Sequence, residues 1–591
     1  MCGLVGYNGD GQAAQFILDG LKKLEYRGYD SAGIATIHDG LLHYKKDAGK
    51  LEDVDRRHHL SRLSGHVGIG HVRWATHGDV TQINAHPHLD GGNNIAVVHN
   101  GIVDNVRELR CSLESTCSFA STTDTEVIPC LLAHFYRQKD SMVAAIAATI
   151  AELRGAFAFL VISRHNPNRF FASAREMPLL LGRVVAGYAA SSDVNSLPDG
   201  CNELFALEDG QIAEVTPQGF VFYDSAGIAM EKHCETLPRQ VSAVTHGNAF
   251  EHYMMREIRE QPRVLEQAIE QSVSDMQEAV KTIKQAQNVI FTACGTSRHA
   301  ALMGRYLFSR IGKRMSEVII GSEFQYFADA LRPGSMVIAL SQSGETADVL
   351  FGVRTARARQ SKVISLVNHQ ASQLARLSDI VFPLKCGAEN AVAATKSYMA
   401  QITVLTLLSH NLSGEQEEII QKLKHIIPLV ELSFETNLKH AESLARYIAG
   451  HNACYFIARG SNFHIAMEAA LKMKEVSYVH GEGMPAGELK HGTLALVEKG
   501  TPIVAICPDD YTFDDTLCNV EEAKARGAFI IGVSDRAHSA FDEWCKVPKV
   551  EDILYPFVTI VPLQELAYFT ALARGVDPDR PRNLAKSVTV R

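Results

Sequence analysis

The sequence predicts a layered α+β domain followed by two α/β domains whose sheets are parallel. Early in the chain, short apolar runs bounded by Gly and Asn are typical of buried strands, as in GHVGIGHVRWATHG, NNIAVVHNGIV and GAFAFLVIS. Later, strand and helix patterns alternate, which favours doubly wound parallel sheets. A third observation is that one strand–turn–helix unit occurs twice. At roughly 100–200 residues per domain, a chain of 591 residues has room for about three or four domains.

The first domain is expected to span residues 2–225. Helical stretches such as TDTEVIPCLLAHFYRQ are few among its predicted strands, which favours an antiparallel, layered arrangement. From 226 to 274 the pattern becomes helical and charged, as in NAFEHYMMREIREQPRVLEQAIEQ. We interpret that segment as a linker and a helical preface to the next domain.

The repeat defines the second half. NVIFTACGTSRHAALMGRYLF at 288–308 aligns with NACYFIARGSNFHIAMEAALKMKEV at 452–476, and each copy continues into a further apolar strand. Two related α/β domains are therefore predicted at 275–415 and 440–580, followed by a C-terminal tail at 581–591.

Composition excludes several classes of function. Hydrophobic residues make up 46% and charged residues 21%, and the net charge of -9 argues against a general nucleic-acid or membrane-surface binder. No basic segment precedes the first apolar stretch, and no window approaches about 18 uninterrupted apolar residues, so we expect a cytoplasmic protein. The 12 cysteines show no CxxC spacing, which predicts free thiols, no disulfides and no metal site.

Cys2 stands directly after the initiator methionine. Methionine is normally removed before a small residue, so Cys2 is expected to carry both a thiol and a free α-amine. Such an amine has a reference pKa of about 7.7–8.0 and can accept the thiol proton. Taken alone, a cysteine directly after the initiator methionine is more often an accidental small residue than a nucleophile.

Four further motifs follow the MCG start in order: LEYRGYDSAG at 24–33, HVRWATHG at 71–78, HNGIVDN at 99–105 and TTDTE at 122–126. Together they resemble the glutamine amidotransferases with an N-terminal nucleophile. The resemblance covers the whole first domain. It implies a four-layer fold and the release of ammonia from glutamine.

Residue roles follow from that resemblance. Arg73 would grip the α-carboxylate of glutamine with a bidentate fork, and Asp124 would pair with its ammonium. The Asn100 side-chain amide and the Gly101 N–H would form the oxyanion hole for attack by Cys2. Trp74, Thr76 and His77 would belong to a loop that closes over glutamine, with Trp74 gating the path of ammonia. Arg73 as a surface ion pair and Asp124 as a helix N-cap remain open.

Two turns of the first repeat favour phosphate binding. ACGTSRHAA at 293–301 and ALSQSGETADV at 339–349 follow predicted strands and offer hydroxyls and backbone N–H groups. Neither GxxxxGK[ST] nor GxGxxG accompanies them, so no nucleotide is expected. In the second repeat, CPDDYT carries two carboxylates that would repel phosphate, so we expect a single site. Ordinary helix capping is the alternative for each turn.

The two repeats resemble sugar isomerase (SIS) domains. With GELKHG at 487–492 and the tail PRNLAKSVTV, the chain resembles the family of glutamine–fructose-6-phosphate aminotransferases (isomerising). This implies that glutamine and fructose 6-phosphate give glutamate and glucosamine 6-phosphate, the first step of hexosamine biosynthesis, through an ammonia channel and without a cofactor. The resemblance implies that the sugar phosphate is held by Thr296, Ser297, Ser341, Gln342, Ser343 and Thr346.

The second repeat would supply the isomerisation chemistry. Glu468, Lys472 and Glu475 fall on one helical face, for which a solvated charged stripe is the alternative. By the resemblance, Glu475 moves a proton between C1 and C2 while Lys472 assists. His491 opens the sugar ring in the neighbouring subunit, which implies a homodimer. Lys586 meets the open-chain ketose, as a Schiff base.

Some positions depart from the family pattern. Ala394 stands where a serine is usual and Thr493 where a proline is usual, and Arg298 and His299 replace neutral or aromatic residues. None is expected to touch the catalytic set. Ala394 leaves open an amidotransferase of this architecture that acts on another phosphosugar. A phosphosugar-binding SIS regulator is a further alternative, although it would not need Cys2 and the isomerisation residues together.

Overall fold

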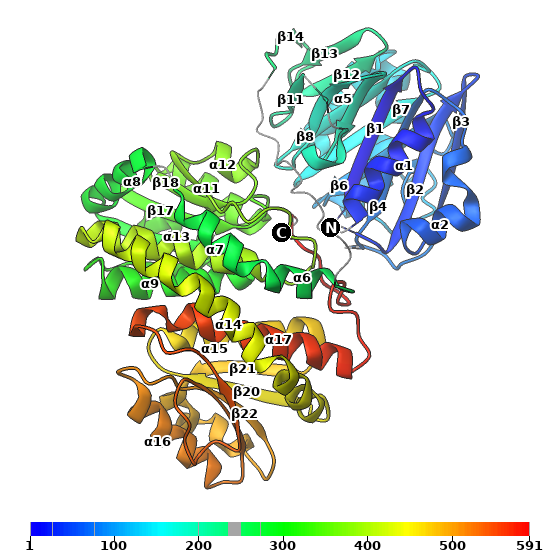
Figure 1. The fold of residues 1–591 in the computed structure, drawn as a ribbon. Coiled ribbons are helices and arrows are strands. Elements are labelled where there is room, and N and C mark those ends of the chain that lie inside the picture. Colours follow the sequence, from blue (N-terminus) through cyan, green and yellow to red (C-terminus); the bar gives the residue numbers. More distant parts are fainter. Residues whose placement is uncertain are drawn as a thin grey trace. The chain divides into compact units, whose positions relative to one another are not determined.

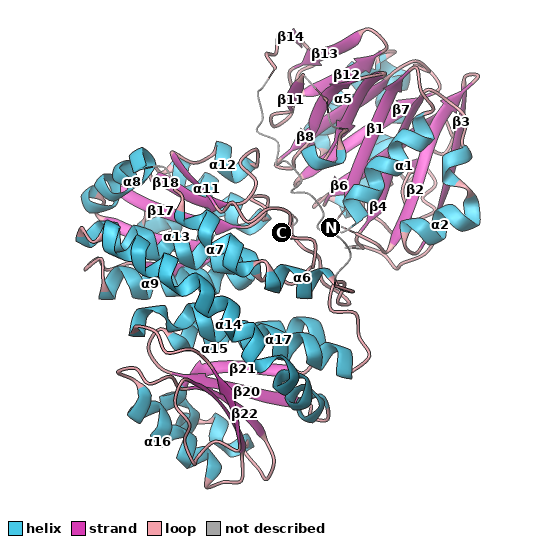
Figure 2. Ribbon diagram, viewed as in Figure 1, coloured by secondary structure: helices cyan, strands magenta, loops and turns pink. Residues whose placement is uncertain are grey.

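The computed structural model describes residues 2–25, 28–75, 77–198, 200–201, 203–234, 250–271 and 273–589 (Figure 1). The predicted glutamine-loop residue Thr76 lies outside these residues. The chain forms two compact units, Met1–Arg239 with Ser587–Arg591 and Gln240–Lys586. Figure 2 shows that the first is rich in strands and that the second alternates helices and strands.

The first unit contains two antiparallel seven-stranded sheets. One, the β1 sheet, has the order β11-β9-β10-β1-β4-β2-β3. Its strands are β1 (Gly3–Gly9), β2 (Ser31–His38), β3 (Leu41–Ala48), β4 (Val67–Arg73), β9 (Leu180–Val184), β10 (Gly187–Ser191) and β11 (Leu204–Ala206). The other, the β7 sheet, has the order β14-β13-β12-β8-β7-β6-β5. Its strands are β5 (His88–Leu89), β6 (Ile95–Gly101), β7 (Phe157–Ser163), β8 (Phe170–Arg175), β12 (Ile212–Thr216), β13 (Gly219–Tyr223) and β14 (Ala229–Met230).

Helices cover the outer faces of both sheets. The β1 sheet carries α1 (Ala13–Leu24) and α2 (Leu51–His58), and the β7 sheet carries α4 (Val127–Lys139) and α5 (Met142–Glu152), with α3 (Val106–Leu113) beside α4. The sequence of strand β7 is apolar without interruption because both faces of the strand are covered. Leu160 and Ile162 face the β1 sheet, whereas Phe159 and Val161 face the helices. Both faces of the strand are therefore buried, and the predicted four-layer fold is confirmed.

The second unit contains two parallel five-stranded sheets with equivalent strand orders, β16-β15-β17-β18-β19 and β21-β20-β22-β23-β24. The repeat inferred from sequence is thus a structural repeat, and the predicted doubly wound parallel architecture is confirmed. The first sheet comprises β15 (Asn288–Ala293), β16 (Glu317–Ile320), β17 (Ser335–Ser341), β18 (Lys362–Val367) and β19 (Ile380–Pro383). The second comprises β20 (Ala453–Ala458), β21 (His480–Pro485), β22 (Pro502–Ile506), β23 (Phe529–Ser534) and β24 (Glu543–Lys546).

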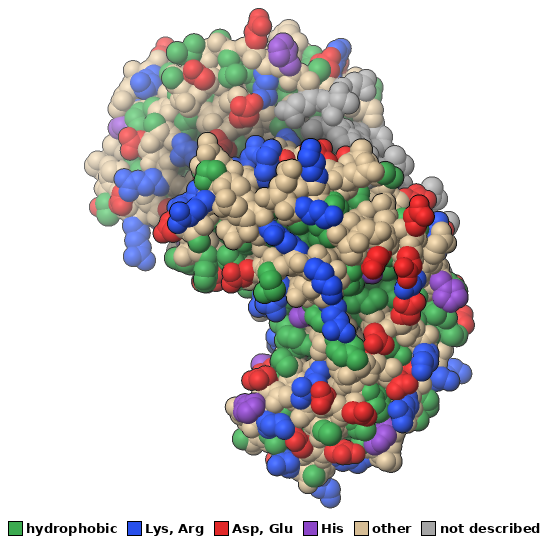
Figure 3. Space-filling model, turned by 90° about the vertical axis from the view of Figure 1, so that its left-hand side faces the viewer, with side chains coloured by type: hydrophobic (Ala, Val, Ile, Leu, Met, Phe, Trp, Pro, Cys, Tyr) green, Lys and Arg blue, Asp and Glu red, His purple; other side chains and the backbone are tan. Residues whose placement is uncertain are grey.

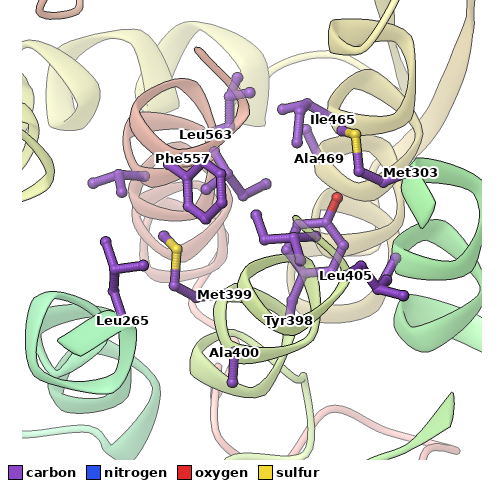
Figure 4. Close-up of a cluster of buried hydrophobic side chains, with 14 of the residues drawn as sticks. Leu265, Met303, Tyr398, Met399, Ala400, Leu405, Ile465, Ala469, Phe557 and Leu563 are labelled. Atoms are coloured by element: carbon purple, nitrogen blue, oxygen red, sulfur yellow. The ribbon is translucent and has the colours of Figure 1, made fainter. Parts of the chain in front are cut away.

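One apolar core joins the two repeats. It receives side chains from both sheets and from helices of each repeat. Figure 4 shows Tyr398 and Met399 in the same cluster as Ile465, Ala469 and Phe557. The helices of this unit are α6 (Tyr253–Arg259), α7 (Gln261–Ile269), α8 (Val273–Gln285), α9 (Gly295–Arg310), α10 (Phe324–Phe327), α11 (Ala347–Ala358), α12 (Gln373–Arg376), α13 (Lys396–Ser413), α14 (Gln416–Ala449), α15 (Asn462–Ser477), α16 (Phe513–Lys524) and α17 (Tyr555–Ala573).

One helical stretch among the described residues, Asp552–Ala573, is long and apolar enough to cross a membrane. However, 83% of its most apolar window is buried inside the protein, because it includes α17 at the centre of the shared core. This helix therefore owes its apolar composition to packing.

Both acidic and basic side chains occur across the face shown in Figure 3.

The expectation that all cysteines are free is wrong. A disulfide joins Cys117 to Cys130, whose Cα atoms lie 6.1 Å apart. The segment after α3 folds back against α4, which brings together two thiols that are separated by 13 residues. Sequence spacing gave no indication of this pairing, because it depends on the path of the intervening loop.

A buried carboxyl on α17 leads to a prediction about stability. Glu565 is fully buried, and burial raises its pKa to about 8 although Arg259 lies 3.4 Å away. In the unfolded chain its pKa is about 4.3, so folding requires proton uptake between these two values and Glu565 destabilises the fold as pH rises. We expect Glu565→Gln to raise the thermal unfolding midpoint at pH 8, by an amount equivalent to about 2–4 kcal/mol, and to have little effect near pH 5.

The control is Glu442→Gln, which changes a carboxyl that is half-exposed on α14 and should leave the midpoint unchanged at both pH values. Equal midpoints for Glu565→Gln and the unmodified protein at pH 8 would contradict the proton uptake.

Candidate active sites

Cys2 lies directly before β1, beside the end of β4. The register of the two strands pairs Gly3 with Val72, which places Cys2 next to Arg73 and Trp74. The Trp74 N–H donates to the Cys2 sulfur at 3.4 Å. Burial raises the pKa of the Cys2 thiol, although the Trp74 N–H and the charge of Arg73 act in the opposite direction. The resting group is therefore a thiol, and a nucleophilic role requires a base.

Arg73 is buried, and its guanidinium donates to the loop that follows β4. The acceptors are the carbonyls of His77, Gly78 and Asp79. The Ala75 N–H donates to Asp30 at 2.8 Å and anchors the start of the same loop. Buried Arg73 is thus no surface ion pair, which removes one alternative left open by the sequence.

The other predicted loop residues surround this anchor. The ring of Trp74 meets Tyr29 edge-on, with 5.6 Å between centroids, and His77 is exposed. The Asn84 side chain donates to the Asp79 carbonyl and to the Thr122 hydroxyl, both at 3.0 Å. The loop after β4 is thereby tied to the segment that carries Asp124.

Asp124 is buried and accepts the Val103 N–H at 2.8 Å. The N-cap of α4 is Glu126, so Asp124 does not cap that helix. Its charge acts on both Cys2 and Arg73. The structure therefore brings Cys2, Arg73 and Asp124 close together in the first unit.

Asn100 and Gly101 end strand β6. Gly101 has a φ of +120°, and a Cβ there would stand 2.0 Å from the Ala156 carbonyl oxygen, so only glycine fits. The Asn100 side chain is buried, and its Oδ1 lies 3.1 Å from His71 Nε2. His71 was not singled out from the sequence, because its partner is brought close only by packing of the two sheets.

The predicted phosphate turns lie at the carboxyl ends of β15 and β17. Strand order reverses between these two strands, and open α/β sheets bind ligands at such a switch point. Ser341 ends β17, and its hydroxyl lies 2.9 Å from that of Thr346, the N-cap of α11. The Gly344 N–H donates to Ser341 at 3.0 Å.

The remaining predicted phosphate-binding residues include Ser343 and Gln342, in the same turn, and Ser297, on α9. The Ser343 hydroxyl accepts the Glu345 N–H at 3.1 Å, and Gln342 is half-buried between the two serines. The Ser297 hydroxyl accepts from Gln401 at 2.8 Å. The turn after β17 is thus compact and rich in hydroxyls.

The equivalent turn of the second repeat is filled by a carboxylate. Asp510 accepts from the Thr512 N–H at 2.8 Å, from the Thr512 hydroxyl at 2.7 Å and from the Asn462 amide at 3.0 Å. Its oxygens occupy the donors that a phosphate would need. This supports the expectation of a single phosphate site in the first repeat.

Lys472, on α15, is fully buried among groups from both repeats. Its Nζ lies 2.5 Å from Glu475 and 3.4 Å from Glu468, and it donates to the Thr296 hydroxyl at 2.8 Å. Burial alone would lower the pKa of Lys472, but the two carboxylates raise it overall. The solvated-stripe alternative is wrong, because Glu468 and Lys472 have no exposed side-chain surface.

His299 lies beside a carboxylate that the sequence analysis did not assign to the catalytic set. Its Nδ1 is 2.8 Å from Glu468, which neighbours Lys472. The Thr296 hydroxyl also donates to Glu468, at 3.0 Å. Two residues near the N-terminus of α9 thus contact helix α15 of the other repeat. Spacing along one helix could not reveal a contact between repeats.

Lys586 and Glu389 form a buried pair, with Nζ 2.5 Å from Oε2. Burial alone would raise the pKa of Glu389, but Lys586 and the N–H groups of Ser397 and Thr395 outweigh it and hold the pKa at about 2. Glu389 is therefore ionised at neutral pH. Glu389 was missed from sequence, although it lies only five residues before Ala394.

His491 ends a 3-10 helix at Ala486–His491 and is exposed. No described interaction joins it to Lys472, Glu475 or Lys586 within this chain.

Comparisons with known proteins agree with this architecture. A glutamine amidotransferase domain model matches residues 71–199, and an SIS domain model matches 282–411 and 447–574. The chain is 41% identical over 602 residues to the glutamine–fructose-6-phosphate aminotransferase (isomerising) of Thermococcus kodakarensis, with all of both chains covered. The chain belongs to the glutamine–fructose-6-phosphate aminotransferase (isomerising) family.

Further similarities support the same family. The aminotransferase of Aquifex aeolicus is 40% identical over 595 residues, again with all of both chains covered. Among solved structures, the C-terminal domain of the aminotransferase from Francisella tularensis is 34% identical with a TM-score of 0.53, covering 56% of this chain and 99% of that domain.

The buried Lys586–Glu389 pair leads to a prediction. Glu389→Gln leaves a buried ammonium without its counter-charge, which typically costs about 3–5 kcal/mol. We expect a clearly lower thermal unfolding midpoint at pH 7. The deficit should shrink as pH falls from about 4.3 toward about 2, because a carboxyl whose folded pKa is depressed stabilises only above that range.

Glu551→Gln is the matched control, since it removes an exposed carboxylate that pairs with Lys422 at 2.8 Å. It should change the midpoint little. If both variants unfold at the same temperature as the unmodified protein at pH 7, the buried pair is not stabilising.

Proposed function

We propose that the protein transfers the amide nitrogen of glutamine to fructose 6-phosphate and isomerises the product to glucosamine 6-phosphate. One observation carries the proposal: a single chain, similar over its full length to such aminotransferases, holds Cys2, Arg73 and Asp124 together in one unit and a Lys472–Glu475 ion pair on helix α15 of the second repeat. The first site releases ammonia and the second consumes it.

In the first half-reaction, the α-amine of Cys2, exposed after removal of Met1, takes the thiol proton because the raised pKa keeps the thiol protonated at rest. Sulfur then attacks the side-chain amide of glutamine. Asn100 and Gly101 N–H groups stabilise the oxyanion, the proton passes to the leaving nitrogen, and ammonia departs. Water hydrolyses the thioester to glutamate. Arg73 would exchange its carbonyl acceptors for the substrate carboxylate, and Asp124 would bind the ammonium.

In the second half-reaction, hydroxyls and N–H groups of the turns after β15 and β17 hold the phosphate. Ser341, Ser343 and Thr346 supply the turn after β17, with Gln342, and Thr296 and Ser297 follow β15. His491 assists ring opening. The Lys586 amine, once it leaves Glu389 and loses its proton, adds to the C2 carbonyl with loss of water.

Ammonia then displaces Lys586 at C2, which leaves an imine. Glu475 removes a proton from C1 and returns it to C2, so that the ketose imine becomes the aldose amine after ring closure. The Lys472 ammonium, 2.5 Å from Glu475, stabilises the carboxylate form of this base. No step needs an oxidant or a cofactor.

A different phosphosugar is the second candidate substrate, because Ala394 replaces a serine that usually faces the sugar. Synthesis of an amino sugar phosphate from glutamine should be compared for fructose 6-phosphate and other ketose and aldose phosphates. Formation of glucosamine 6-phosphate supports the proposal, and its absence with turnover of another sugar would favour the alternative.

Cys2→Ala is the decisive variant for the nitrogen source. We expect it to abolish glutamate release from glutamine while it retains isomerisation of the sugar phosphate, because the thiol serves only the amide. The measurement is glutamate release beside conversion of fructose 6-phosphate. Cys111→Ala, which removes an exposed thiol, is the control and should behave like the unmodified protein. Unchanged glutamate release by Cys2→Ala would rule out the nucleophile.

We further propose a cytoplasmic homodimer in which His491 serves the sugar site of the other subunit. The exposure of His491 and its lack of described contacts with Glu475 and Lys586 support this arrangement. The domain bounds 2–225, 275–415 and 440–580, with the linker and tail between and after them, remain our assignment.

Mixed dimers test this exchange. When His491→Ala and Lys586→Ala chains are co-expressed with different tags and the mixed dimer is isolated, one of its two sites has both residues intact. We expect each variant alone to lose more than about 90% of synthesis, as for loss of an acid–base group, and the mixed dimer to recover close to half of it. No recovery would place both residues in the same subunit's site.

A further inference from the structure

Four buried histidines surround the end of strand β6 in the first unit, and the mechanism above uses none of them. They are His71, His86, His88 and His99, each at most 4% exposed. The rings of His71 and His86 lie 4.1 Å apart and those of His86 and His88 lie 4.8 Å apart. Burial lowers the pKa of all four, so the cluster is uncharged at neutral pH.

Only His71 contacts a predicted catalytic side chain among these four. Its Nε2 lies 3.1 Å from Oδ1 of Asn100. The other three bind hydroxyls beside Asp124: His86 and His99 bind Thr125 at 3.0 and 2.9 Å, and His88 binds Thr123 at 3.1 Å. The cluster therefore supports two parts of the glutamine site through different members.

The direction of the His71–Asn100 hydrogen bond follows from the chemistry of its atoms. An amide oxygen can only accept, so His71 Nε2 carries the proton and Nδ1 does not. The His99 backbone also hydrogen-bonds the His71 ring, and Nδ1 has no side-chain partner among the described residues. Neutral His71 in its Nε2–H form thus holds Oδ1 and leaves the amide nitrogen as the free end of Asn100.

That orientation decides whether Asn100 can serve in an oxyanion hole. The free end must be the NH₂ group, because a reversed amide would present its oxygen to a developing negative charge. We propose that His71 is a positioning residue that locks the Asn100 amide with its nitrogen toward the oxyanion. The inference rests on the proposed glutaminase function and deepens it.

The test compares His71→Leu, which lacks a donor, with His71→Gln, whose side-chain NH₂ can replace the Nε2–H. Glutamate release from glutamine should show kcat lowered by about 10- to 100-fold in His71→Leu, with KM changed by less than about threefold. His71→Gln should recover about tenfold of that loss. A general loss of structure would not distinguish the two variants.

A second readout isolates the oxyanion. Alkylation of Cys2 by iodoacetamide, followed by mass spectrometry of the N-terminal peptide, needs the thiol but forms no oxyanion. Its rate should stay within about twofold in both His71 variants, since only oxyanion stabilisation is altered. The matched control is His88→Gln, in the same cluster but bonded to Thr123, which should alter KM for glutamine more than kcat.

Three results would overturn the proposal: an unchanged kcat in His71→Leu, a parallel loss of alkylation, or no advantage of Gln over Leu. Failure of the proposed function is distinguishable. It would show as glutamate release that survives Cys2→Ala, whatever the His71 variants do.

Discussion

The buried charge of Lys472 is the constraint on which the sugar half of the protein depends. An ammonium with no exposed surface is stable only when it is paired, and its partners are Glu468 and Glu475 on its own helix and Thr296 from the other repeat. This requirement fixes the turn after β15 against α15, and the apolar core shared by the two repeats holds that contact in place. The duplicated fold thus brings hydroxyls of one copy into contact with charged groups of the other.

The two copies differ at their equivalent turns. In the first, Ser341 and Thr346 leave a hydroxyl-rich turn at the switch point of the sheet. In the second, Asp510 satisfies the same kind of donors from within the chain. A phosphate and a carboxylate compete for the same N–H and O–H groups, so filling one turn with Asp510 leaves a single site for the ligand. The second copy is then free to contribute helix α15.

Local motifs predicted more of the site than composition or periodicity could. Cys2, Arg73, Asn100 and Asp124 were found because each follows or precedes a strand or helix in a short, ordered pattern. Contacts between distant segments were not predictable, and they include Glu389 beside Lys586, His299 beside Glu468 and His71 beside Asn100. The disulfide between Cys117 and Cys130 was missed for the same reason. Spacing in the sequence predicts which residues are neighbours within one helix or strand. These pairs join different elements, so they form only when the layers of the fold pack together.

Burial is compatible with paired charges in the sugar site, whereas in the Cys2 site most of the buried titratable groups are neutral. Around Lys472 and Lys586, charges are kept and paired, which suits a reaction in which a carboxylate and an amine must exchange protons. Around Cys2, burial raises the thiol pKa and keeps the four histidines neutral, while the charge of Arg73 acts on the thiol. A neutral amide donor such as Asn100 stabilises an oxyanion only if its orientation is set beforehand, because it has no charge to attract the oxygen from a distance. In the Cys2 site, a neutral and buried imidazole therefore sets the orientation of the Asn100 amide. In the sugar site, pairing of opposite charges fixes the reacting groups instead.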